Sequence, residues 1–258
     1  NIHTPKGIVR GVFGWPAIHV RKGKDANLAP TLENIFIDVG AKDKKEVEEL
    51  GIHVGCVITY DDGYEEINKK CFIGRALDNR LGGYCIAEVA RKLFEEKIKL
   101  PYSLYVVNSV QEEVGLHGAT MIAQTIRPDV AIITDVTQDT STPLIDAKQK
   151  GDVRLGLGPA LTYAPSVHRK LLQLIEEAAQ VNNIPFQRVA SSRSTGTDTD
   201  AFAYANGGIP SALISIPLRY MHTTVEMAHF EDISHLINLI SASLQQIKSG
   251  HNFKYFDR

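Results

Sequence analysis

The chain has 258 residues, with 28 Lys and Arg against 30 Asp and Glu, and therefore a formal net charge of -2 at pH 7. Its hydrophobic share of 43% and charged share of 22% are those of ordinary globular proteins, which excludes a disordered, collagen-like or coiled-coil chain. The positive and negative charges are balanced, so the composition does not indicate binding to nucleic acid or to an anionic membrane. No apolar run approaches the roughly 18 residues of a membrane span. Peptide or small-molecule partners are therefore favoured.

Residues 1–70 contain short β-like runs separated by Gly, Pro and Asp, together with one charged helix candidate at 44–50. The runs are Ile8–Phe13, Ile35–Val39 and Val54–Tyr60. This pattern predicts a small β-rich domain over residues 1–70.

From Cys71 onward, apolar strand-like runs alternate with helical patterns, which is typical of an α/β domain over residues 71–258. The predicted strands are 103–110, 130–134, 187–190 and 211–216. The predicted helices are 82–96, 119–126, 167–182, 199–205 and 233–249. The apolar strand runs suit a sheet that helices cover on both faces.

Three cysteines, Cys56, Cys71 and Cys85, form neither a CxxC pair nor an even disulfide framework. This usage is typical of a reducing compartment, so we predict a cytoplasmic protein in which the cysteines serve packing.

Four polar clusters follow strand-like runs or precede a helix, the positions where functional side chains gather in open α/β sheets. They contain Asp78, the pair Glu112 and Glu113, Asp135, and His222. Each has a structural alternative on its own: a helix cap for Asp78, a surface loop for the Glu pair, a loop cap for Asp135 and a structural role for His222. Together, the carboxylates and the imidazole form a ligand set typical of paired divalent metals.

The adjacent Glu pair suggests a division of labour. One carboxylate can bind metal while its neighbour, pointing elsewhere, takes a proton from a water whose pKa the metal lowers towards about 7. A carboxylate shared between two cations about 3.5 to 4 Å apart can bridge them. No Gly-x-Ser-x-Gly elbow and no dinucleotide-binding glycine pattern is found in the sequence.

The order of these motifs resembles the glutamyl and tetrahedral (TET) aminopeptidase family, which often carries an endoglucanase label. The resemblance rests on Ala76-Leu77-Asp78-Asn79-Arg80, Gln111-Glu112-Glu113-Val114-Gly115, Thr134-Asp135-Val136, Gly196-Thr197-Asp198 and Arg219-Tyr220-Met221-His222-Thr223. It implies an α/β fold, a mixed sheet flanked by helices, with a small inserted β-barrel dimerisation domain at residues 1–70.

The resemblance also implies two divalent metal ions, zinc or cobalt. Asp78 would bridge them, Glu113 and His222 would complete one site, Asp135 would belong to the other, and Glu112 would be the general base. The family takes a further histidine from a His-x-Asp segment ahead of the barrel insertion. We expect that segment to be missing here, together with the N-terminal part of the catalytic domain.

Less specific parts of the resemblance concern the substrate. Asp198 and Arg219 would bind or orient it, with Asp200 as the competing choice for Asp198. The peptide bond between Asp78 and Asn79 would be cis.

The activity implied is metal-dependent removal of N-terminal residues from short peptides, by homo-oligomers in which dimers assemble into a dodecamer. Two alternatives stay open: a related two-metal deacylase or carboxypeptidase, and a non-catalytic assembly subunit lacking one metal-ligand histidine. A glycosidase is disfavoured, because two Glu residues adjacent in sequence do not readily flank a sugar from opposite sides.

Overall fold

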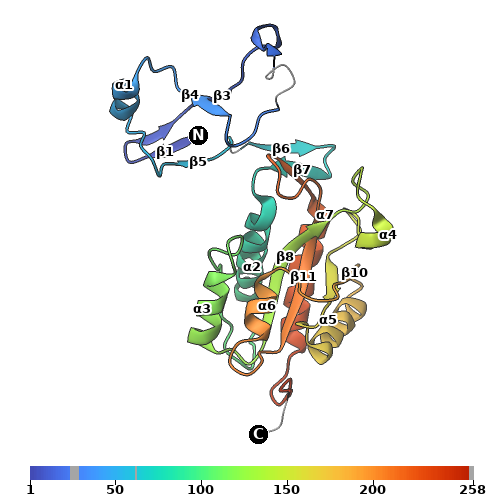
Figure 1. Ribbon diagram of the computed structural model, residues 1–258. Helices are drawn as coiled ribbons and strands as arrows, with labels where there is room; N and C mark the ends of the chain where they lie inside the picture. Colours follow the sequence, from blue (N-terminus) through green and yellow to red (C-terminus); the bar gives the residue numbers. More distant parts are fainter. Residues whose placement is uncertain (24–28, 62, 256–258) are drawn as a thin grey trace. The chain divides into compact units, whose positions relative to one another are not determined.

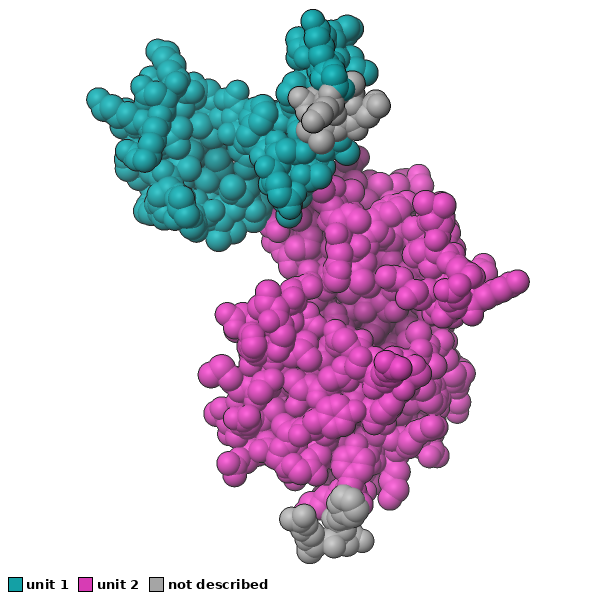
Figure 2. All heavy atoms as spheres, viewed as in Figure 1, with its two compact units in different colours: residues 1–62 teal, residues 63–258 magenta. Residues whose placement is uncertain are grey.

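The computed structural model describes residues 1–23, 29–61 and 63–255, and its elements are shown in Figure 1. The chain divides into two compact units, residues 1–62 and residues 63–258, which are coloured separately in Figure 2.

The first unit consists of short strands with one short helix. β1 (Ile2–Thr4) lies between β2 (Gly7–Val9) and β5 (Val57–Ile58), and β3 (Val12–Gly14) pairs with β4 (Phe36–Asp38); all these pairings are antiparallel. A 3-10 turn, η1 (Ile18–Val20), and helix α1 (Lys44–Glu49) complete the unit. The described strands of this unit thus form two small sheets, so the β-rich character is found while the closed barrel stays a prediction.

A small sheet opens the second unit. β7 (Cys71–Gly74) pairs antiparallel with β6 (Tyr64–Ile67) on one side and with β12 (Glu226–His229) on the other. These pairings tie residues 64–67 to the second unit, whereas the sequence placed the boundary near residue 70. The sheet also joins the start of the unit to a strand near its end, and Asp78 thereby comes close to His222 and Glu226.

The main sheet is mixed, as predicted. Its strand order is β10 (Gln187–Ala190), β9 (Ala160–Tyr163), β11 (Ser211–Leu218) and β8 (Ala131–Gln138). β11 runs parallel to β8 and antiparallel to β9. Every residue of β11 is buried, because its apolar run is covered on both faces.

Helices pack against this sheet in two groups (Figure 1). α2 (Leu77–Glu95) and α5 (Arg169–Val181) both contact α7 (Phe230–Gln246), whereas α3 (His117–Ile126) contacts α6 (Asp198–Ala203). A further short helix is α4 (Ala147–Lys150). The apolar residues of α2, α5 and α7 that face the sheet form one core with β8 and β11. Of the described helices, none has the length and apolar character that a membrane crossing requires.

The strand predicted at residues 103–110 is not formed. Residues 103–109 make no ladder with any described strand, and β8 is paired on one edge only, with β11. The apolar pattern of the segment favours a strand, but a strand needs a neighbouring edge to satisfy its backbone groups. In the described structure the segment instead lines a cavity beside β8.

Candidate metal centre

Asp78 lies where the backbone turns from β7 into α2. Ala76 has a left-handed conformation (φ 52°), Asp78 and Asn79 have non-helical dihedral angles, and the peptide bond between them is cis, as the resemblance implies. The N-cap position of α2 is occupied by Ala76, and Asp78 lies in the first turn instead. The helix-cap alternative is therefore not what the structure shows, and the carboxylate is free for another role.

Three predicted ligands from distant parts of the chain converge at this point. One ligand atom each from Asp78, Glu113 and His222 lies within 4.8 Å of the other two. The Nε2 atom of His222 is 2.9 Å from Oδ2 of Asp78 and 3.6 Å from Oε2 of Glu113. The Asp78 side chain is only 9% exposed, whereas those of Glu113 and His222 are 57% and 64% exposed. The cluster is thus shielded from solvent on the side of Asp78 and exposed to solvent on the side of Glu113 and His222.

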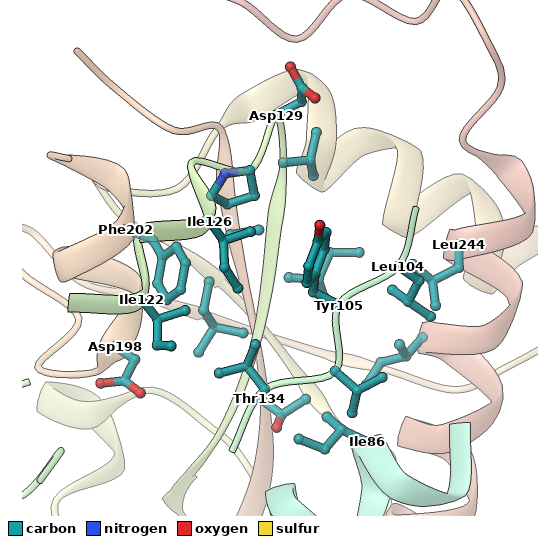
Figure 3. A pocket seen from close by; sticks show the side chains of 18 of the residues that line it. Ile86, Leu104, Tyr105, Ile122, Ile126, Asp129, Thr134, Asp198, Phe202 and Leu244 are labelled. Carbon is teal, nitrogen blue, oxygen red and sulfur yellow. The ribbon is translucent and has the colours of Figure 1, made fainter. Parts of the chain in front are cut away.

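A cavity of about 940 Å³ adjoins the cluster. Its lining includes five predicted site residues: Asp78, Glu112, Glu113, Asp135 and Asp198. The rest is largely apolar. Figure 3 shows Ile122, Ile126 and Phe202 on one side of the pocket, Leu104 and Leu244 on the other, and Tyr105 between them.

The carboxylates around the cavity perturb one another. Burial, followed by the charge of Glu113, raises the pKa of Asp78 to about 6. Burial and the same Glu113 charge raise the pKa of Glu112 to about 7. Burial raises the pKa of Asp135 to about 8, against a hydrogen bond that its carboxylate accepts from the Val136 N–H. These groups share a low-dielectric pocket in which their negative charges are poorly compensated.

The same donor set fits a divalent cation. Two carboxylates and an imidazole are ligands that zinc and cobalt accept, and the exposed side of the cluster leaves room for water or substrate. Asp198 lines the same cavity: one of its carboxylate oxygens accepts from the Ser109 hydroxyl, and the other is buried without a hydrogen-bond partner among the described residues. A cation would supply the compensation that the carboxylates lack.

Two other predicted residues are engaged elsewhere. The Arg219 guanidinium donates from Nε to Oδ2 of Asp139 at 2.7 Å and from Nη2 to the Ser141 hydroxyl at 3.0 Å. Asp200 accepts from the backbone N–H groups of Thr195 and Gly196, a loop-stabilising role. Neither Arg219 nor Asp200 lines the cavity, so the geometry favours Asp198 over Asp200 and holds Arg219 in an ion pair.

Two buried carboxylates that the sequence did not single out contact predicted site residues. Asp139 is fully buried; burial would raise the pKa of its carboxyl, but hydrogen bonds from Ser141 and Arg219 lower it. Glu226 is 2% exposed and contacts the backbone of two predicted ligands. No signal in the sequence pointed to this role, because the strand Glu226–His229 was not predicted and the burial of the carboxylate becomes visible only in the fold.

The raised pKa values predict how the stability of the metal-free protein depends on pH. A carboxyl whose pKa is raised on folding binds more protons in the folded than in the unfolded state, so the free energy of unfolding falls as pH rises. For Asp78, Glu112 and Asp135 the affected range runs from about pH 4 to about pH 8. We expect the melting temperature in EDTA to fall across this range.

Saturating zinc should offset part of the fall at pH 8, since at 100 times the dissociation constant a ligand adds about 2.7 kcal/mol, or roughly 5–10 °C. Melting curves at pH 5 and pH 8, with EDTA or with zinc, measure both effects. The Asp135→Asn variant is the control, because its loss of one titrating group should flatten the slope in EDTA. A wild-type slope in that variant would contradict the assignment of Asp135.

Comparison with known proteins places these features in context. The family model described as M42 glutamyl aminopeptidase matches residues 1–239. The lysyl aminopeptidase of Pyrococcus furiosus is 36% identical over 251 residues, which are 95% of this chain and 69% of that protein.

Solved structures agree with this result. The TET aminopeptidase of a marine sediment archaeon of the Thaumarchaeota superposes with a TM-score of 0.89 at 29% identity, covering 96% of this chain and 70% of that chain. The TET1 peptidase of Pyrococcus horikoshii, described as able to assemble into a tetrahedron or a large octahedral shell, gives 0.75 at 28% identity, covering 94% and 70%. The chain thus spans about seven tenths of the length of these relatives.

Proposed function

The chain belongs to the M42 glutamyl aminopeptidase family, and from that premise we propose that it acts in a metal-dependent aminopeptidase that removes N-terminal residues from short peptides. The resemblance predicted from the motifs is confirmed by the family match. The members of this family are peptidases, so the chain is a member of a family of peptide hydrolases. We further propose that it binds two metal ions, that these ions are zinc or cobalt, and that its substrates are short peptides.

One observation carries the proposal: three ligand-type side chains meet at the edge of a cavity that also holds a separate carboxylate of raised pKa. Asp78, Glu113 and His222 supply two oxygens and a nitrogen within 4.8 Å of one another. Glu112 lines the same cavity, and burial raises its pKa to about 7. A general base works best with a pKa near the operating pH.

The mechanism divides the work between ligands and base. A divalent cation held by Asp78, Glu113 and His222 would lower the pKa of water and polarise a carbonyl, and a second cation would be held between Asp78 and Asp135. Glu112 accepts the proton of the attacking water and passes it to the leaving amine. Asp198, with one oxygen unpartnered, offers a negative group for the free substrate amine.

The preference for a free amine is the test that separates an aminopeptidase from a deacylase or carboxypeptidase. We expect hydrolysis of peptides with a free N-terminus and at least about 100-fold slower hydrolysis of N-acetylated forms, because acetylation removes the charge that Asp198 would bind. The measurement compares kcat/KM for each matched pair. Dialysis against EDTA should abolish the activity, and zinc or cobalt should restore it.

Three other results would lead to different conclusions. Faster cleavage of the N-acetylated peptides would favour the deacylase. Activity that survives complete metal removal would remove the metal from the mechanism. No hydrolysis by metal-saturated protein would favour the non-catalytic assembly subunit.

Self-association is the second part of the proposal. The described part of the first unit exposes several large apolar side chains, of which Ile8, Val12 and Val57 are each more than 60% exposed. Ile8 and Val57 both lie opposite His3 in the same small sheet, and exposed apolar side chains that are grouped in this way are typical of a contact surface. We propose homodimers formed through this unit that assemble further into a dodecamer in the cytoplasm.

A further inference from the structure

Glu226 is a buried acid at the back of the metal centre. It is the first residue of β12 and lies opposite Gly74 of β7 in the antiparallel pairing. Its side chain is 2% exposed, and no described Lys, Arg or His side chain forms an ion pair with it. A buried carboxylate without a cationic partner is costly unless its oxygens accept hydrogen bonds.

Both oxygens of this carboxylate accept from the backbone of candidate metal ligands. Oε2 accepts from the Asp78 N–H at 3.0 Å, and Oε1 accepts from the His222 N–H at 3.0 Å. These two ligands are far apart in the sequence, yet their side chains approach to 2.9 Å. One carboxylate therefore joins the backbones of both.

Neither backbone is held by regular secondary structure. Asp78 has non-helical dihedral angles at the start of α2, and His222 has φ 61°, a left-handed conformation that is unfavourable for a residue with a side chain. The loop of His222 is closed at its base, where Arg219 and Met227 exchange two backbone hydrogen bonds. Glu226 adds the contact that fixes the position of His222 itself within that loop.

We propose that Glu226 is the positioning residue of the metal centre, a carboxylate that holds the backbones of Asp78 and His222 at the separation that cation binding requires. Its charge adds to the negative potential that attracts the cation. The inference rests on the proposed metal site and assigns a new residue to it. Glu226 would touch neither substrate nor cation.

The test uses Glu226→Gln in the full chain. The amide retains one acceptor oxygen, but its NH₂ group faces the second backbone N–H, so one hydrogen bond is lost together with the charge. We expect the dissociation constant for zinc or cobalt, measured by competition with a chelator, to rise by about 10–100-fold. The visible spectrum of the cobalt form should also change, because it reports ligand geometry.

Hydrogen exchange in EDTA gives a second readout that needs no metal. The amides of Asp78 and His222 should exchange faster in Glu226→Gln than in the wild type, while amides in α5 stay protected. Equal protection in the two proteins would overturn the inference.

Asp232→Asn is the matched control. Asp232 is also a fully buried carboxylate that accepts from two backbone N–H groups, those of Gly156 at 2.7 Å and Gly158 at 2.8 Å. We expect this variant to lower the melting temperature but to leave the metal dissociation constant and the cobalt spectrum unchanged. If both variants lost the same amount of metal affinity, Glu226 would contribute only to general stability, and the inference would be overturned.

Glu226→Asp keeps the test decisive if the Gln variant does not fold. Asp retains the charge but is one methylene shorter, so it cannot reach both N–H groups, and we expect weaker cation binding and faster exchange at one of the two amides. If the wild-type protein binds metal and either Glu226→Asp or Glu226→Gln binds it with the same affinity, the inference is overturned and the proposed function stays intact. A wild-type protein that binds no zinc or cobalt overturns the proposed function itself.

Discussion

Glu112→Gln is expected to lower kcat/KM by about 10²- to 10⁴-fold, the usual contribution of a general base, while metal content stays at the wild-type level. Glu112 lines the cavity beside the cluster of candidate ligands but is not one of the three side chains in that cluster. Gln has nearly the same shape and cannot accept the proton. The loss should therefore fall on kcat more than on KM.

The environment of Glu112 gives this prediction its pH dependence. Burial and the neighbouring Glu113 charge raise the pKa of Glu112 in the metal-free chain to about 7. A bound cation would offset part of that shift, so kcat/KM of the wild type should rise with pH along a limb whose midpoint is near or below 7. The remaining activity of Glu112→Gln should lack this limb.

The neighbouring residue supplies the control. Glu113→Gln removes a carboxylate of the same size from the cluster of candidate ligands, so we expect it to lower metal content as well as activity. Elemental analysis after dialysis separates the two variants. Full activity in metal-loaded Glu112→Gln would show that Glu112 is not the base, and metal loss in that variant would make it a ligand.

Much of the fold could be predicted from the sequence because periodicity reports burial. The helical pattern at residues 167–182 corresponds to α5, whose buried face includes Leu171, Leu172 and Ile175. The apolar run at 211–216 corresponds to β11, which is buried throughout. Such patterns depend only on which side of an element meets the core, and the sequence carries this information directly.

Pairing partners are not encoded in the same way. Residues 103–110 have the pattern of a buried strand, but no described strand pairs with residues 103–109. β9 and β12 were not predicted, whereas β10, which also has only four residues, was; strands this short carry too little periodicity to be predicted consistently. A segment becomes a strand only when it pairs with a neighbouring strand, and the tertiary fold decides which strand edges meet.

The site shows the same contrast. Asp78, Glu113 and His222 could be predicted because they follow or precede recognisable elements and because their order resembles a known family. Asp139 and Glu226 act through contacts with residues 80 and 148 positions away, Arg219 and Asp78 respectively. No local pattern reveals such a contact.

Asp78→Asn is expected to have opposite effects on the metal-free and the metal-bound protein. In the metal-free chain, burial raises the pKa of Asp78 to about 6, so a neutral amide at this position should raise the melting temperature at pH 8. With zinc, the variant should lack the stabilisation that the wild type gains. We expect cation affinity to fall by at least about 100-fold, more than the loss of a supporting residue costs, and activity to be lost with it.

The change in melting temperature relative to the wild type should therefore be positive in EDTA and negative in zinc. This reversal distinguishes a metal ligand from a residue that only supports the fold. A structural residue would lower the melting temperature under both conditions. The exposed Asp152→Asn is the control, since among the described residues its carboxylate pairs with Arg154 at the surface, and the change should affect neither state. Melting curves at pH 8 in EDTA and in zinc, with a chelator titration for affinity, provide the measurement. If Asp78→Asn bound zinc as tightly as the wild type, the metal centre would have to lie elsewhere, because Asp78 is the least exposed carboxylate of the three-residue cluster and the one closest to His222.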